Sequence, residues 1–284
     1  MRRLFTLTLL LGVMSAISAS PVDCPHDLAE SSEVRFPSRT DVASRMVWFY
    51  ASNHSPLEWL VFPVKGRICA RTSDSDQYIA RPAFVPEADS FRGASRLARV
   101  DDGWLVGFNQ GEFGAALYWF SLDGRSHYKI SEHQVVEFFR YAGEWAAIEG
   151  LDHLGLARGS IIRITRTNPQ RRWQAQTALT LTSAPYAVAQ VPYGPTLVVL
   201  SHAVVAIEGL NRPTALLENA PWEGLYPQSA ALTADSRTLY IGMRQYVAEL
   251  DLRTRKLRML LPRGAALNQL PENDEKRLRA TYRR

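Results

Sequence analysis

The chain has 284 residues, of which 46% are hydrophobic and 21% charged, and its formal net charge at pH 7 is +5. This length suits one large domain, since all-β folds often reach about 200–250 residues as a single unit. The excess positive charge is small and its basic residues are scattered singly, whereas nucleic-acid binding calls for a concentrated basic stripe or an aromatic-basic motif, so we expect no nucleic acid as a partner.

The N-terminal segment predicts export. Arg2 and Arg3 precede an apolar run over residues 4–13 and a stretch of small residues over 15–20, which is the pattern of a secretory signal peptide. We assign the signal peptide to residues 1–19. No later stretch approaches the roughly 20 apolar residues that a transmembrane helix needs, so no transmembrane segment is expected. The expected location is therefore periplasmic or secreted.

Residues 20–44 read as an irregular N-terminal arm that contains one of only two cysteines, Cys24 and Cys69. Disulfides persist in exported proteins, and the two cysteines do not have the CxxC spacing of a reactive thiol pair. We therefore expect a disulfide that tethers the arm to the first strand region. Closing a loop of this length stabilises a fold by about 4 kcal/mol in the chain-entropy model.

A repeated four-strand pattern begins after the arm. Residues 46–51, 59–64 and 68–70 have strand-like composition and predict a first unit. Four further units cover residues 96–262, and their second strands begin at Trp104, Trp145, Leu197 and Leu239. The last unit is the clearest, with strands predicted over 229–234, 238–243, 246–252 and 256–261 and polar turns between them.

Four-stranded units with a period of about 40–50 residues resemble the blades of β-propellers. No WD dipeptide or kelch-type diglycine is present, so the resemblance is one of pattern and period. It implies an all-β propeller of about five four-stranded blades over residues 45–262, with the disulfide-tethered arm before it. A β-sandwich or an open β-barrel is the alternative, since both also consist of short, regularly spaced strands.

The C-terminal tail, residues 263–284, is polar, and over 273–284 its acidic residues come first and its basic residues last. This order suits a short helix, because each charge complements the nearer end of the helix dipole. A solvated helix or frayed end is the simplest interpretation, and a basic docking tail is the alternative.

Local signatures of catalysis and of metal or cofactor binding are absent from the sequence. There is no GxSxG elbow, P-loop, HExxH or EF-hand loop, and the spacing of His127 and His133 is not a zinc pattern. We therefore assign no catalytic residue, no metal and no cofactor.

Candidate binding residues lie in the loops. In propellers, loops between the second and third strands and loops between blades emerge on one face, and sites on rigid β scaffolds usually lie on such loops. The residues 111–114 place Glu112 and Phe113 between glycines, whereas Asp152 and His153 are neighbours whose side chains are expected to point apart. The candidate loop face comprises Glu112, Phe113, His133, Asp152, His153, Arg158, Tyr186, Trp222 and Tyr226.

The predicted innermost strands, residues 97–100, 138–141, 187–190 and 230–233, contain no acidic residue, although propeller hydrolases usually carry acids there. We therefore favour binding over catalysis. The expected function is that of an exported, non-enzymatic propeller that engages another protein of the periplasm or cell envelope, such as an inhibitor or immunity protein. The alternative is a glycan-active or lactone-active propeller hydrolase, which makes a glycan the second expected partner. The longest loops place the site near the units that begin at Arg96 and Val135.

Overall fold

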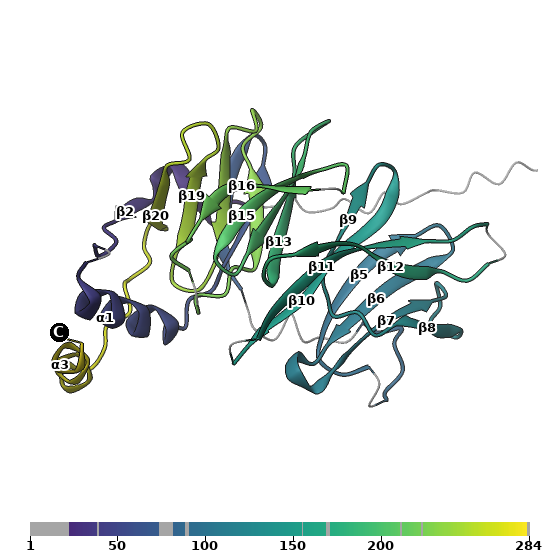
Figure 1. Ribbon diagram of the computed structural model, residues 1–284, viewed down its shortest axis with the longest axis horizontal. Coiled ribbons are helices and arrows are strands. Elements are labelled where there is room, and N and C mark those ends of the chain that lie inside the picture. Colours follow the sequence, from purple (N-terminus) through teal and green to yellow (C-terminus); the bar gives the residue numbers. More distant parts are fainter. Residues whose placement is uncertain are drawn as a thin grey trace, which may run out of the picture.

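The computed structural model describes residues 23–38, 40–73, 82–88, 91–154, 156–168, 171–210, 212–222 and 224–282. The predicted signal peptide, residues 1–19, lies outside the described residues. The described chain forms five β-sheets, four of which follow the predicted repeat units. Figure 1 shows the four repeat sheets succeeding one another along the long axis of the molecule.

Each repeat unit forms a meander in which every strand pairs antiparallel with the next. The first two sheets are β5 (Ala94–Val100), β6 (Gly103–Asn109), β7 (Ala115–Phe120) and β8 (His127–Ser131), and β9 (Val135–Tyr141), β10 (Glu144–His153), β11 (Leu156–Thr165) and β12 (Gln174–Leu181). The next two are β13 (Pro185–Gln190), β14 (Thr196–Leu200), β15 (Ala203–Glu208) and β16 (Arg212–Glu218), and β17 (Ser229–Leu232), β18 (Thr238–Gly242), β19 (Val247–Asp251) and β20 (Leu257–Leu261). This arrangement confirms the predicted all-β propeller pattern.

The fifth sheet differs from its prediction, because it has three strands. Its order is β1 (His26–Asp27), β4 (Arg67–Thr72) and β3 (Trp59–Val64). The stretch 46–51, predicted as a strand, lies instead within helix α1 (Val42–Asn53). Asp41 caps the start of this helix, and its carboxylate accepts a hydrogen bond from the Ser44 amide at 2.9 Å.

The strand prediction for residues 46–51 was wrong because a short run of aromatic and aliphatic residues fits a buried strand and a helix equally well. In the structure, side chains one helical turn apart lie on the same face and contact the same residue of the last repeat. Trp48 stacks on Tyr246 with 5.0 Å between ring centroids, and Ser52, one turn later, donates a hydrogen bond to the Tyr246 hydroxyl at 3.2 Å. The helix therefore covers the core of the last repeat.

The N-terminal arm contributes to two sheets. Strand β1 pairs with β4, and a short 3₁₀ turn (Leu28–Glu30) leads to β2 (Ser32–Val34), which pairs antiparallel with β20. The last sheet therefore has five strands, of which the outermost comes from the arm.

The hydrophobic core lies mainly between consecutive sheets. Strand β10 shows why, because its alternate residues face opposite sides: Ala147 packs toward the β5–β8 sheet and Ile148 toward the β13–β16 sheet. A third cluster lies between the β13–β16 sheet and the last sheet. A fourth lies between the last sheet and the three-stranded sheet. The outer face of the β5–β8 sheet is covered by Val85 and Phe91, which pack on Val106.

Helix α3 (Glu272–Thr281) confirms the helix predicted in the C-terminal tail. It packs beside α1 at the end of the molecule that carries β2 and β20, as Figure 1 shows. An Arg279 guanidinium nitrogen lies 3.2 Å from the Ser44 hydroxyl of α1. Among the residues that the structure describes, no helix is long and apolar enough to cross a membrane.

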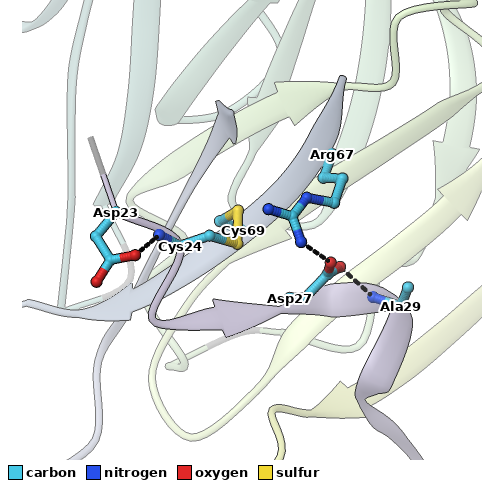
Figure 2. The surroundings of a disulfide bond; sticks show 6 residues. All are labelled: Asp23, Cys24, Asp27, Ala29, Arg67 and Cys69. Atoms are coloured by element: carbon cyan, nitrogen blue, oxygen red, sulfur yellow. Dashed lines mark hydrogen bonds and ion pairs between the residues drawn. A yellow bond between two sulfur atoms is a disulfide. The ribbon is translucent and has the colours of Figure 1, made fainter. Parts of the chain in front are cut away.

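Cys24 and Cys69 form the predicted disulfide, with 5.3 Å between their Cα atoms. Figure 2 shows the bridge beside an ion pair between Arg67 and Asp27, whose closest atoms are 3.0 Å apart. Both links join the arm to β4, and Cys69 is fully buried. Because disulfides form and persist mainly in oxidising compartments, the bridge indicates an extracytoplasmic location.

Candidate functional site

Two hairpin ends of neighbouring sheets meet at one end of the strands. The β6–β7 connection is a 3₁₀ turn, Gly111–Phe113, and the β10–β11 hairpin turns at Leu154. Across the gap between them, the imidazole Nε2 of His153 lies 2.8 Å from Oε2 of Glu112. Since a carboxylate only accepts hydrogen bonds, Nε2 carries the proton and the contact ties the two hairpins together.

Large apolar side chains project from this joined end. The Phe113 side chain is 82% exposed and that of Leu154 is 91% exposed, and Leu156 beside it is also exposed. Leu154 has a φ of +47°, a conformation that is uncommon for a residue other than glycine and that fixes the tight hairpin turn. We call Phe113, Leu154 and Leu156 the tip surface.

Gln134, in the loop between β8 and β9, holds the base of the tip surface. Its side chain is buried, and its amide nitrogen donates to Asn109 Oδ1 at 2.8 Å and to the Gly111 carbonyl at 3.0 Å. Its amide oxygen accepts from Arg158 at 3.1 Å. Loops from both sheets are thereby fixed by one residue, which the sequence analysis did not single out.

Glu149 of β10 is a second buried polar residue beneath this end, and it too was missed. Ser160 donates to its Oε1 at 2.5 Å, and an Arg158 nitrogen lies 3.7 Å from its Oε2. A buried carboxylate is tolerated when it is paired and hydrogen-bonded in this way. The one sequence signal for it is an acidic residue that interrupts the apolar run from Trp145 to Leu151.

Asp152 and His153 point apart, as expected. The Tyr186 hydroxyl donates to Asp152 Oδ2 at 3.3 Å, while His153 reaches Glu112. The Nδ1 of His133 lies 2.8 Å from the Ser131 hydroxyl within its own loop. Asp152 therefore does not orient His153 as a general base.

The remaining two predicted residues belong elsewhere in the fold. Trp222 is fully buried, and its indole N–H donates to the Leu200 carbonyl at 3.0 Å, so it is a core residue without surface for a partner. Tyr226 is exposed beneath the Arg244 guanidinium, 5.0 Å from its ring centroid, and Arg244 also pairs with Glu58 at 2.8 Å. These contacts belong to the last sheet and to the three-stranded sheet.

The innermost strands do contain an acidic residue, which corrects the sequence analysis. Strand β9 begins at Val135, three residues before the predicted start at residue 138, and therefore includes Glu137. The Glu137 Oε2 accepts a hydrogen bond from the Val188 amide at 3.0 Å. Burial raises the pKa of Glu137 to about 7, although the Val188 amide and the nearby Arg96 charge act in the opposite direction.

Glu137 lines a cavity of about 560 Å³ between the innermost strands. Residues of β3, β9, β13 and β17 surround it, among them Pro63, Phe138, Val188 and Ala231. Within the described part of the chain, no group of three or more His, Cys, Asp or Glu residues is placed to hold a metal ion.

No family model matches the chain, and no curated protein matches it. Among solved structures it is similar to virginiamycin B lyase from Staphylococcus aureus, with 15% identity and a TM-score of 0.40 over 60% of this chain and 56% of that chain. For a streptogramin B lyase the identity is 16% and the TM-score 0.44, over 65% of this chain and 59% of that chain. For TolB from Acinetobacter baumannii the identity is 14% and the TM-score 0.39, over 75% of this chain and 52% of that chain.

The chain thus spans little more than half the length of these three proteins. At these identities and TM-scores, the fold assignment rests on the five sheets themselves and not on the similarities.

Proposed function

We propose that this protein is an extracytoplasmic binding propeller that holds another protein through its tip surface, Phe113, Leu154 and Leu156. The observation that carries the proposal is the near-complete exposure of Phe113 and Leu154 at the joined end of two sheets. Aromatic and aliphatic anchors that enter a partner's pocket supply most of the binding energy of many interfaces.

The rigidity of the tip supports this function. The contact between Glu112 and His153 joins the hairpins, and Gln134 ties the loop 109–111 to Arg158. Anchors that are already held in place lose little conformational entropy when a partner binds, which favours affinity. A tip of this kind fits a partner with an apolar pocket whose rim offers acceptors to Arg158 and His153.

The disulfide supports a partner from the same oxidising compartment, so we take the partner to be a protein of the periplasm or cell envelope. Inhibition of an exported enzyme or toxin is one form that such binding takes, because an apolar anchor on a rigid scaffold can block a cleft.

The test is capture from an envelope extract with two variants. Wild-type protein should retain one stoichiometric partner, and the double variant Phe113→Ala, Leu154→Ala should lose it. The matched control is Leu122→Ala, which removes an exposed leucine at the opposite end of the β5–β8 sheet and should retain the partner. All three proteins should have the same melting temperature. Equal capture by the double variant would refute the proposal.

One observation favours the alternative of a propeller hydrolase. A carboxyl group with a pKa of about 7 can act as a general acid or base near neutral pH, and Glu137 lines a cavity between the innermost strands. Under this alternative, the protein hydrolyses a member of a glycan or lactone panel, Glu137→Gln removes the activity, and the tip variant retains it. An inactive wild-type protein across the panel would exclude it.

A further inference from the structure

A pair of equivalent arginines lies at the end of the strands opposite the tip surface. Arg99 of β5 and Arg140 of β9 occupy matching positions in successive repeats, because each pairs directly with the first tryptophan of the next strand, Trp104 or Trp145. Each guanidinium lies over that indole ring, at 5.2 Å for Arg99 and 4.7 Å for Arg140. Both arginines are exposed.

The guanidinium groups of this pair contact backbone carbonyls. Arg99 donates to the carbonyls of Val100 and Gly103 at 2.7 and 2.8 Å, and Arg140 donates to the Gly143 carbonyl at 2.5 Å. Within the described chain, neither guanidinium has a carboxylate partner.

The neighbouring arginines are different. Arg163 pairs with Glu144, and Arg166 pairs with Asp101 and Asp102. Among the arginines that line this groove and the cavity next to it, Arg99 and Arg140 are therefore the two without a carboxylate partner in the described chain.

The two guanidiniums line a shared groove. A cavity of about 470 Å³ is bordered by Arg99, Arg140, Trp145, Trp173 and the ion pair of Arg166 with Asp101. The tryptophan beneath each guanidinium and the carbonyls at its edge hold it in place, so its remaining N–H groups are available to the groove. A guanidinium held in this way is suited to carboxylate, sulfate or phosphate groups, which it can bind through two parallel hydrogen bonds.

The groove continues in both directions. It shares Arg140 and Trp145 with the cavity that Glu137 lines, and it shares Glu144 and Thr165 with a further cavity of about 740 Å³. That third cavity is lined by hydroxyl and amide side chains, among them Thr167, Gln176 and Thr177, beside the ion pair of Arg163 with Glu144. An extended groove with hydroxyl, amide and arginine groups fits a linear polymer better than a compact ligand.

We propose that this arginine groove binds an acidic polysaccharide, with Arg99 and Arg140 each engaging a carboxylate of the sugar chain. The hydroxyl-rich extension then contacts neutral sugar hydroxyls. The site is independent of the tip surface, because strand β10 starts at Glu144 in the groove and ends at His153 beside the tip, and ten extended residues span about 30 Å.

The experiment measures binding of a short oligogalacturonate by calorimetry at low ionic strength, with wild-type protein and three variants. Arg99→Gln and Arg140→Gln should each weaken binding about 10-fold, since each removes a charge-assisted hydrogen bond to the ligand. The matched control is Arg253→Gln, which removes the same charge from the exposed β19–β20 turn and should leave the affinity unchanged. The tip variant Phe113→Ala, Leu154→Ala should also bind normally, which separates this site from the proposed protein-binding function.

Two further probes decide the class of ligand. The methyl-esterified oligomer, which has the same sugars without the charges, should bind much more weakly, and a poly-glutamate peptide should bind more weakly than oligogalacturonate. The proposal is overturned if oligogalacturonate does not bind, if the esterified oligomer binds equally well, if poly-glutamate binds as tightly, or if Arg253→Gln weakens binding as much as Arg140→Gln does.

Discussion

Glu137 shows how one side chain can be held in an environment that opposes its charge. Its carboxylate accepts a hydrogen bond from the Val188 amide, and burial is the largest influence on its pKa. Arg96, at the matching position of the preceding repeat, directs its Nε to the Val136 carbonyl at 2.9 Å and offsets only part of the cost. The carboxyl group is therefore protonated more readily in the folded chain than in the unfolded one.

Replacing Glu137 by Gln tests this cost. Because the pKa of Glu137 is higher in the folded chain than in the unfolded chain, protonation of this carboxyl group stabilises the fold. The stabilisation is complete below the usual carboxyl pKa of 4.5 and is lost as the pH rises through about 7. The glutamine variant, whose amide oxygen can still accept from Val188, should therefore be more stable than wild type at pH 8, by up to about 3 kcal/mol, and similar at pH 4. Urea unfolding at the two pH values measures the difference. Glu132→Gln, at an exposed carboxylate, is the control and should show no such trend.

At the scale of elements, the three-stranded sheet is attached to the last sheet by backbone contacts. The Trp59 amide donates to the Met243 carbonyl at 3.1 Å, and the Val61 amide donates to the Ser229 hydroxyl at 2.9 Å. Gly242 of β18 permits this approach, because a Cβ atom there would lie 2.2 Å from the Trp59 carbonyl oxygen. The glycine is needed for space and not for an unusual backbone conformation.

Gly242→Ala should therefore destabilise the protein, by about 2 kcal/mol, because the clash is with backbone that cannot rotate away. Gly194→Ala is a suitable comparison, since its added methyl group would meet the side chain of Val191, and its cost should be clearly smaller. Thermal or urea unfolding of both variants measures the difference. Equal stability of wild type and Gly242→Ala would contradict the close approach of β3 and β18.

The sequence predicted elements well where local signals agreed and poorly where tertiary contacts decided. All four strands of the last repeat lie where turn residues and alternation placed them. Residues 46–51 became a helix because their apolar run is ambiguous, and its packing on Tyr246 is set by residues far along the chain. A segment of this kind cannot be assigned from its own composition.

The same limit applies to the candidate site. The shared face of the loops was predictable from repeat topology, and Glu112 and His153 are in contact there. The burial of Trp222 was not predictable, because its side chain packs in a cluster with residues of α1, the β13–β16 sheet and the last sheet, most of which lie far from it in the sequence. Glu137 was missed because the start of β9 depends on its pairing with β10, and a shift of the predicted start placed the residue outside the strand.

For the whole molecule, the disulfide is the main covalent constraint on the N-terminal arm. Cys24 and Cys69 are separated by 45 residues, and the loop they close contains β1, β2, α1 and β3. Removal of the bridge by Cys24→Ala should cost about 4 kcal/mol, because the unfolded chain regains the freedom that the closed loop denies it. Guanidinium unfolding of the variant, compared with reduced wild type, measures the loss.

Cys24→Ala and reduced wild type should agree, because both keep the Cys69 side chain in the core. Cys69→Ala should lose more, since it also removes a fully buried sulfur atom. A variant lacking the bridge that unfolds at the same denaturant concentration as the oxidised protein would show that the arm is held by β1 and β2 alone.

The pairing of β2 with β20 has a consequence for the order in which the molecule can be completed. Glu33 lies opposite Leu260, so β2 cannot pair until synthesis has passed β20, more than 200 residues later. Until then, β2 has no partner and the growing chain presents an open strand edge, which is where proteins associate wrongly. A chain interrupted before β20 can fold its earlier sheets and yet keep that edge exposed. The β2 segment of the arm is thus paired only in a chain that has been made through β20.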